Sequence, residues 1–245
     1  MVSRAARFPH SSRVHARGET KPWEKLAGAR RIQESWLANY EKRALLWLAA
    51  RTPLRVNSDH LTGLGLAAQI GGGACYALAR WHKYALLGVI LCLALNWLGD
   101  SLDGTLARVR QQLRPRYGFY VDHIVDSLGA VALMGGLASS GYMHPWIAIG
   151  LLVAFLTLSI QSYLATIALQ EFRISFWRFG PTELRLLLAA GNIALLWKTR
   201  VHLLGHSYRL FDVGGAVGLA GMTLMLLWFT LQNTARLYRG ERVAR

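Results

Sequence analysis

Long apolar runs alternate with short polar segments along most of this chain. Several runs approach the roughly 20 residues that a helix needs to cross a hydrocarbon core. They predict six transmembrane helices, at about residues 61–79, 84–100 and beyond, 118–141, 145–169, 184–197 and 213–231. The pattern therefore predicts an all-α, polytopic membrane protein with six transmembrane helices.

The second apolar run is interrupted by acidic residues before it is long enough to span a bilayer. It is apolar only from Tyr84 to Gly99, so the helix must continue through Asp100. Ionisable side chains are costly in the middle of a membrane. Asp100 and Asp103 are therefore expected at or just beneath one interface, in a water-accessible mouth.

The segment before the first run has a different pattern. From Trp23 to about Thr52, apolar residues recur at helical spacing opposite a basic face, which predicts an amphipathic helix on the membrane surface over residues 22–52. A soluble helix is the alternative. Residues 1–21 are basic and lack the apolar region of a secretory signal, so we expect a disordered tail there. After the amphipathic helix, residues 53–245 are expected to form one membrane domain.

The charge of the chain, +15 at pH 7, indicates an anionic partner. Its basic residues flank apolar runs and form no nucleic-acid motif, so we expect membrane lipids and no nucleic acid. Lys and Arg gather in the N-terminal segment, in the loops after the second and fourth runs, and at the C-terminus. The positive-inside rule then places both termini and the aspartates in the cytoplasm, and a bacterial inner membrane is the expected location.

Four aspartates stand out in this apolar chain. Asp100 and Asp103 share a helix face, and Asp122 and Asp126 lie one turn apart on the next helix. Facing helices would bring the four carboxylates together, where they could hold divalent cations, relay protons or neutralise arginines in a structural ion-pair network. The spacing favours cations, because two Mg²⁺ ions held by carboxylates can clamp a phosphoryl group during in-line displacement.

Three further residues fit a phosphate-bearing ligand. Gly104 and Gly118 have no side chain to keep a bulky polar ligand from the backbone. Arg108 would compensate pyrophosphate charge. His123 follows Asp122 but points about 100° away on a helix, so we do not expect it to be a metal ligand.

The spacing Asp-x2-Asp-Gly-x2-Ala-Arg-x9-Gly-x3-Asp-x3-Asp resembles the signature of the CDP-alcohol phosphatidyltransferases. All eight fixed positions are present, as Asp100, Asp103, Gly104, Ala107, Arg108, Gly118, Asp122 and Asp126. The six-helix layout is also similar to that of the family. The resemblance implies a CDP-linked lipid donor and two metal ions, Mg²⁺ or Mn²⁺, held by Asp100, Asp103, Asp122 and Asp126.

The resemblance also implies residue roles in the reaction. Asp126 would be the general base, with CMP departing as the acceptor hydroxyl attacks. The residues implied to bind CDP are Gly104, Ala107, Arg108, Gly118, Asn57 and Thr62. The last two resemble the Pro-Asn-x2-Thr sequence that precedes the family's first helix, although Val56 replaces the proline and the interval is longer. Capping the first helix is the alternative role for both.

The acceptor site is expected in the loop before the fifth run. Its candidate residues are Arg178, Thr182, Glu183 and Arg185. An arginine pair at a helix start would bind an anionic acceptor such as a sugar or polyol phosphate. Anchoring the loop on the cytoplasmic side is an equal alternative.

Three functions follow, in order of preference. The first is transfer of a phosphatidyl group from CDP-diacylglycerol to an alcohol, in phospholipid synthesis. The second moves a phospho-headgroup from a CDP-linked small alcohol to a lipid hydroxyl. The third, a cation transporter, would spread its carboxylates across the bilayer depth, whereas these four lie near one face. A homodimer is compatible with each.

Overall fold

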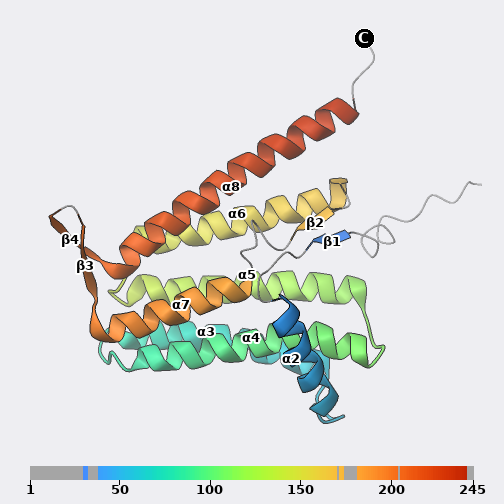
Figure 1. Ribbon diagram of the computed structural model, residues 1–245, viewed down its shortest axis with the longest axis horizontal. Coiled ribbons are helices and arrows are strands. Elements are labelled where there is room, and N and C mark those ends of the chain that lie inside the picture. Colours follow the sequence, from blue (N-terminus) through green and yellow to red (C-terminus); the bar gives the residue numbers. More distant parts are fainter. Residues whose placement is uncertain (1–29, 33–37, 170, 174–180, 204, 242–245) are drawn as a thin grey trace, which may run out of the picture.

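The computed structural model describes residues 30–32, 38–169, 171–173, 181–203 and 205–241. The helices in this part of the chain are α2 (Ala38–Arg51), α3 (Ser58–Ala79), α4 (Ala85–Val109), α5 (Pro115–Ser139), α6 (Pro145–Leu169), α7 (Pro181–Trp197) and α8 (Leu210–Gly240). The short strands are β1 (Arg30–Ile32), β2 (Glu171–Arg173), β3 (Arg200–Leu203) and β4 (His206–Arg209). The prediction of an all-α class is confirmed (Figure 1).

Five of the described helices, α3, α4, α5, α6 and α8, are long and apolar enough to cross a membrane. The chain is therefore an integral membrane protein. The predicted segment 184–197 corresponds to α7, which has 17 residues. At 1.5 Å per residue α7 is about 25 Å long, which is less than the hydrocarbon thickness of about 30 Å. Five crossings are thus supported by helix length, and the sixth stays a prediction.

The predicted surface helix is shorter than expected. The prediction of a helix over 22–52 is wrong at Arg30–Ile32, which form β1 and pair in parallel with β2. This pairing satisfies backbone hydrogen-bonding groups through a segment far away in the sequence, which a local helical pattern cannot reveal. Helix α2 begins at Ala38. The predicted tail at 1–21 lies outside the described residues.

Helix α2 crosses the end of the bundle and packs on α4 (Figure 1). Its Leu45 and Ala49 are buried in a small apolar cluster with residues of α3 and α4, namely Leu61, Leu102 and Leu106. Its other face exposes Leu46 and Trp47, and the Arg51 guanidinium lies 4.0 Å from the centroid of the Trp47 ring. This exposed face is the part of α2 that suits a membrane surface.

Close helix contacts fix α4 and α5 on opposite stretches of α3. A Cβ atom on Gly99 of α4 would collide with the backbone of Leu61 and Gly65 in α3. A Cβ atom on Gly136 of α5 would collide with the backbone of Gly73 in the same way. Glycine at Gly73 and Gly136 therefore lets α3 and α5 approach each other closely.

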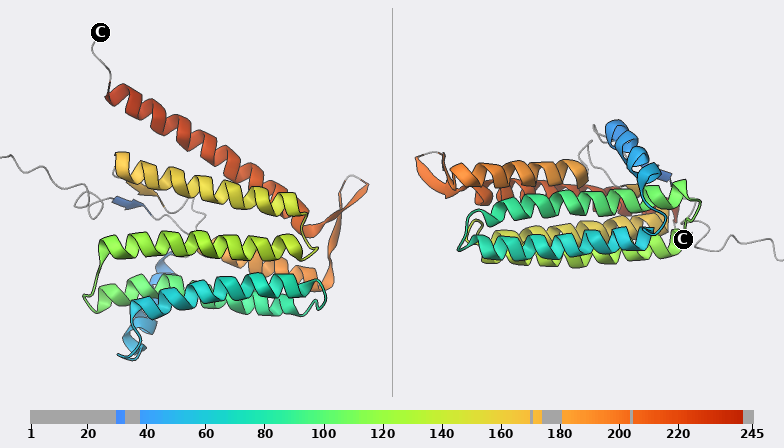
Figure 2. Two further views of the ribbon diagram at one scale, coloured as in Figure 1. Left: turned by 180° about the vertical axis from the view of Figure 1, so that it is seen from behind. Right: turned by 90° about the horizontal axis from the view of Figure 1, so that it is seen from below.

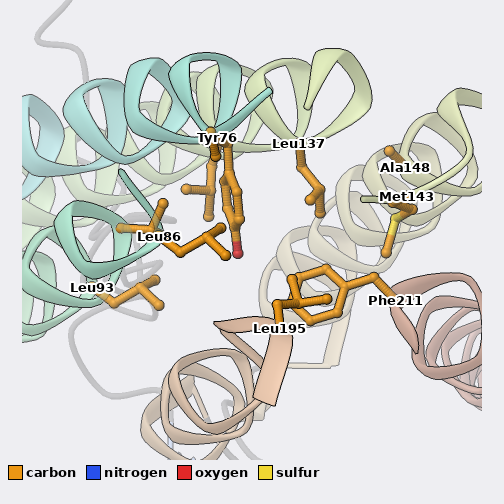
Figure 3. Packing of buried hydrophobic residues seen from close by; sticks show 11 residues of the cluster. Tyr76, Leu86, Leu93, Leu137, Met143, Ala148, Leu195 and Phe211 are labelled. Atoms are coloured by element: carbon orange, nitrogen blue, oxygen red, sulfur yellow. The ribbon is translucent and has the colours of Figure 1, made fainter. Parts of the chain in front are cut away.

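The main apolar core, whose side chains are drawn in Figure 3, lies at the end of the bundle far from α2 (Figure 1). It joins the ends of α3 to α8, through buried residues that include Leu86, Leu137, Met143, Leu195 and Phe211. Within it, the buried Asn192 amide of α7 donates to the Tyr76 hydroxyl of α3 at 2.8 Å. From this end α8 packs on α6 and then diverges from the bundle (Figure 2).

Candidate active site

The four aspartates lie at the end of the bundle that α2 crosses. Asp100 and Asp103 occupy the last three turns of α4, which continues unbroken to Val109. The prediction that this helix runs on through Asp100 is confirmed. Asp122 and Asp126 lie about two and three turns after Pro115, where α5 begins. The turn between the two helices therefore places all four carboxylates at one end of the molecule.

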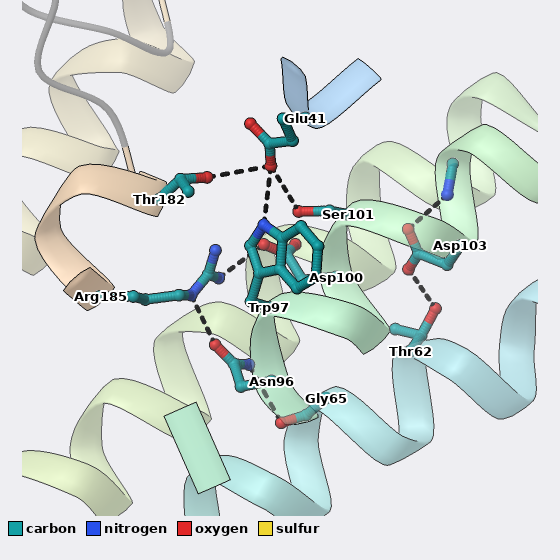
Figure 4. A network of polar contacts seen from close by, with 11 residues as sticks. Glu41, Thr62, Gly65, Asn96, Trp97, Asp100, Ser101, Asp103, Thr182 and Arg185 are labelled. Atoms are coloured by element: carbon teal, nitrogen blue, oxygen red, sulfur yellow. Dashed lines mark hydrogen bonds and ion pairs between the residues drawn. The ribbon is translucent and has the colours of Figure 1, made fainter. Parts of the chain in front are cut away.

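Asp100 pairs with an arginine of α7 (Figure 4). Arg185 Nη2 donates to Asp100 Oδ2 at 2.6 Å, and Arg185 Nε donates to Asn96 Oδ1 at 2.8 Å. The buried Asn96 in turn donates to the Gly65 carbonyl at 3.1 Å. The side chains of Arg185 and Asp100 are 15% and 34% exposed, so both are partly shielded from water. Three helices thus fix one ion pair.

Asp103 is buried and held by hydrogen bonds at both of its carboxylate oxygens. Thr62 Oγ1 donates to Oδ2 at 2.6 Å, and the Gly104 amide donates to Oδ1. Ser58 Oγ donates to the Asp103 carbonyl at 3.0 Å. Residues in the first turns of α3 therefore hold Asp103 in its orientation.

Asp126 completes the cluster from α5. It interacts electrostatically with Asp100, Asp103 and Asp122, and with the opposite charge of Arg185. Four carboxylates from two helices are thus within electrostatic reach of one another. Such a concentration of negative charge in a membrane protein requires compensation by cations.

Among the described residues, no three acidic, histidine or cysteine side chains stand close enough together to form a metal site as they are oriented. Asp100 turns toward Arg185, and Asp103 turns toward Thr62. The donor chemistry nevertheless fits a divalent cation, since carboxylate oxygens are the ligands that Mg²⁺ and Mn²⁺ prefer.

The residues predicted to bind CDP surround this end of α4 and α5. Space is open at Gly118, where a Cβ atom would meet nothing within 4 Å. Arg108 Nε donates to the Gly104 carbonyl at 2.9 Å, so this exposed side chain folds along its own helix. Ala107 is partly buried beside it.

Asn57 and Thr62 have structural partners in α3 and α4. Asn57 caps α3, where its Oδ1 atom accepts from the His60 amide at 3.0 Å. Thr62 binds Asp103 instead of capping the helix. The capping alternative is therefore confirmed for Asn57, while Thr62 touches the aspartate cluster directly.

The predicted acceptor residues separate into two groups. Arg178 lies outside the described residues. Arg185 reaches the aspartate cluster, whereas Thr182, one turn earlier, donates to Glu41 Oε1 at 3.0 Å. Glu183 is partly buried in the same turn of α7. The structure thus brings one acceptor candidate into the site and uses another to connect helices.

Sequence reasoning missed Glu41 and Asn96. Glu41 of α2 accepts hydrogen bonds from α4 and α7, and Asn96 accepts one from Arg185. The sequence contains one indication of a role for Glu41, because it is an acidic residue among the basic residues of the predicted surface helix. His123, which was not expected to be a ligand, lies against the rings of Phe119 and Tyr163, at centroid distances of 4.2 and 4.4 Å.

Comparison with protein families agrees with this geometry. The family model described as CDP-alcohol phosphatidyltransferase matches residues 57–231, from the start of α3 into α8. The chain therefore belongs to the CDP-alcohol phosphatidyltransferase family. It is an enzyme of phospholipid synthesis that transfers a phospho-alcohol between a CDP-activated donor and an acceptor, and the family uses divalent metal ions. A comparison with curated proteins found no match.

Proposed function

We propose that this enzyme transfers the phosphatidyl group of CDP-diacylglycerol to the hydroxyl of a phosphorylated alcohol and releases CMP. The observation that carries the proposal is the arrangement of four aspartates at one end of the bundle with Arg185 beside them. The carboxylates suit a metal-bound pyrophosphate, and the arginine suits an anionic acceptor.

In this proposal Asp100, Asp103, Asp122 and Asp126 hold two divalent ions, Mg²⁺ or Mn²⁺. Bound there, the ions would neutralise the pyrophosphate charge of the donor. Thr62 and the Gly104 amide keep Asp103 in one orientation. The open space at Gly118 leaves room for the nucleotide, and Arg108 on α4 has an exposed side chain that can reach a charged ligand.

Asp126 acts as the general base. It takes the proton of the acceptor hydroxyl, whose oxygen forms a bond to the phosphorus of the phosphatidyl group. The bond from this phosphorus to the bridging oxygen breaks, and that oxygen leaves with CMP. Arg185, which pairs with Asp100 and interacts electrostatically with Asp126, orients the phosphate of the acceptor so that its hydroxyl meets the donor.

Two observations favour this function over its alternatives. Arg185 is partly buried in the cluster, where it can bind the phosphate of a small soluble acceptor. A headgroup transferase would instead place a neutral lipid hydroxyl there. A cation transporter would need carboxylates along the membrane depth, whereas these four gather at one end.

A donor and acceptor assay tests the proposal. The protein in phosphatidylcholine vesicles with Mg²⁺ should release CMP from CDP-diacylglycerol only when a phosphorylated polyol is added. Asp126→Asn should lower turnover by at least about 100-fold, the usual contribution of a general base. Mn²⁺ binding should weaken much less than turnover, because three carboxylates of the cluster remain. Asp212→Asn is the matched control, because Asp212 binds the His144 amide at the far end of the bundle.

Two results would overturn the proposal. One is CMP release from a CDP-linked small alcohol with diacylglycerol as acceptor, and none from CDP-diacylglycerol. That result would establish headgroup transfer. The other is undiminished turnover in Asp126→Asn, which would remove the general base from the mechanism.

A further inference from the structure

A carboxylate of the surface helix α2 joins the two helices that carry the Asp100 and Arg185 ion pair. Glu41 Oε1 accepts hydrogen bonds from Trp97 Nε1 at 2.9 Å, Ser101 Oγ at 3.1 Å and Thr182 Oγ1 at 3.0 Å (Figure 4). Glu41 is half-buried, and hydrogen bonds to a carboxylate are among the stronger ones in proteins. One oxygen atom therefore connects α2, α4 and α7.

The three donors flank the ion pair in the sequence. Trp97 and Ser101 lie three residues before and one residue after Asp100 on α4. Thr182 lies one helical turn before Arg185 in the first turn of α7. Figure 2 shows α2 and α7 on the same side of α4. Glu41 thus connects the turn that presents Asp100 with the turn that precedes Arg185.

We propose that Glu41 is a positioning residue that keeps the first turn of α7 docked on α4 when Arg185 leaves Asp100. This inference rests on the proposed function, in which Asp100 binds a cation and Arg185 binds the acceptor. Arg185 itself provides one polar connection between α7 and α4. Thr182 provides another through Glu41. When the first is given up, the second holds Arg185 within reach of the acceptor.

The packing of α2 makes this support firm. Leu45 and Ala49, one and two turns after Glu41, are buried against α3 and α4. The neighbouring Lys42 and Arg43 are exposed. Substitution of Lys42 therefore changes the charge of α2 without touching α4 or α7, which makes Lys42→Ala the matched control for Glu41→Ala.

Kinetics provide the first test. Glu41→Ala should raise the KM for the acceptor by roughly tenfold, the effect of losing about one hydrogen bond to a charged group. The KM for CDP-diacylglycerol should change much less, because the four aspartates remain. Glu41→Gln keeps an acceptor oxygen for the three donors and should restore most of the acceptor KM. Lys42→Ala should behave as the unsubstituted enzyme.

A distance measurement provides a second test that does not depend on turnover. In a protein whose Cys75 and Cys92 are replaced by serine, spin labels are attached at Arg43 of α2 and Leu187 of α7, which are both exposed. The distance between the two labels reports the separation of α2 and α7. With Mg²⁺ as the only divalent cation, pulsed electron paramagnetic resonance on the labelled protein with Glu41 intact should give a narrow distance distribution. Glu41→Ala should broaden it, whereas Glu41→Gln and Lys42→Ala should not.

The outcomes separate this inference from the proposed function. An unchanged distribution in Glu41→Ala, or equal increases in both KM values, would overturn the positioning role. If the unsubstituted protein releases no CMP from CDP-diacylglycerol, the proposed function fails. The distance distributions still decide whether Glu41 docks α7. If the Glu41→Ala protein does not fold, Thr182→Val takes its place, because it removes the α7 donor to Glu41. It should broaden the distribution in the same way, and an unchanged distribution in Thr182→Val would overturn the positioning role.

Discussion

Arg185 is the residue whose observed place changes the interpretation of the site most. Its sequence context suggested an acceptor contact, and the structure places it on Asp100, a predicted metal ligand. An ion pair in a partly shielded position is favourable because each charge compensates the other. Any cation that binds Asp100 must therefore compete with the Arg185 guanidinium. A cation bound at Asp100 would take the place of Arg185 as the compensating charge of this carboxylate.

This competition predicts the effect of Arg185→Gln on metal binding. Removal of the guanidinium should tighten Mn²⁺ binding by a factor on the order of 10, equivalent to about 1.4 kcal/mol, while turnover with a phosphorylated acceptor falls. Titration calorimetry with Mn²⁺ measures the affinity. Arg114→Gln is the control, because Arg114 pairs with Asp59 at the exposed start of α3. Equal or weaker Mn²⁺ binding in Arg185→Gln would contradict the competition.

The sequence alone could identify those site residues whose place depends on their spacing within one helix. The sequence was enough to place Asp100 and Asp103 on one helix and Asp122 and Asp126 on the next, and a short apolar run was enough to extend α4. Glu41 could not be found in this way. Its three donors lie 56, 60 and 141 residues away in the chain, so its role depends on tertiary packing.

The same distinction applies to secondary-structure elements. The predicted fourth segment agrees with α6 at both ends, because Pro145 opens that helix and its apolar run continues without a charge. The helix predicted from residue 22 is wrong at β1, since the helical pattern there competes with pairing to β2. A periodic pattern therefore predicts an element well where the element needs no partner beyond lipid or core.

Close packing of α3 and α5 predicts a difference between two neighbouring glycines. A Cβ atom on Gly136 would collide with the backbone of Gly73, whereas one on Gly135 would meet nothing within 4 Å. Gly136→Ala should lower the free energy of unfolding by about 1–3 kcal/mol through overpacking. Gly135→Ala should be neutral or slightly stabilising, since alanine favours helix. Thermal unfolding in detergent compares them, and equal melting temperatures would refute the close approach.

At the scale of the whole molecule, the two ends of the bundle have different compositions. One end gathers the aspartates, α2 and the first turn of α7, while the other holds the main apolar core and the β3 to β4 hairpin. Helix α7 connects them. Its Thr182 binds Glu41 at the aspartate end, and its Leu195 is buried in the core at the other end. Although α7 is short, it carries the chain from one end to the other.

This path predicts six crossings with both termini on the side of the aspartates. Helix α8 begins in the core at Phe211 and returns toward the aspartate end (Figure 1). In a protein whose Cys75 and Cys92 are replaced by serine, a cysteine at Arg239, near the end of α8, should react with a membrane-impermeant maleimide only from the cytoplasmic side. A cysteine at Ser207 in β4 should react only from the opposite side. Both positions are exposed. If α7 does not cross, the two sides are exchanged. The cysteine at Ser207 will then react from the cytoplasmic side, and the cysteine at Arg239 will react from the opposite side.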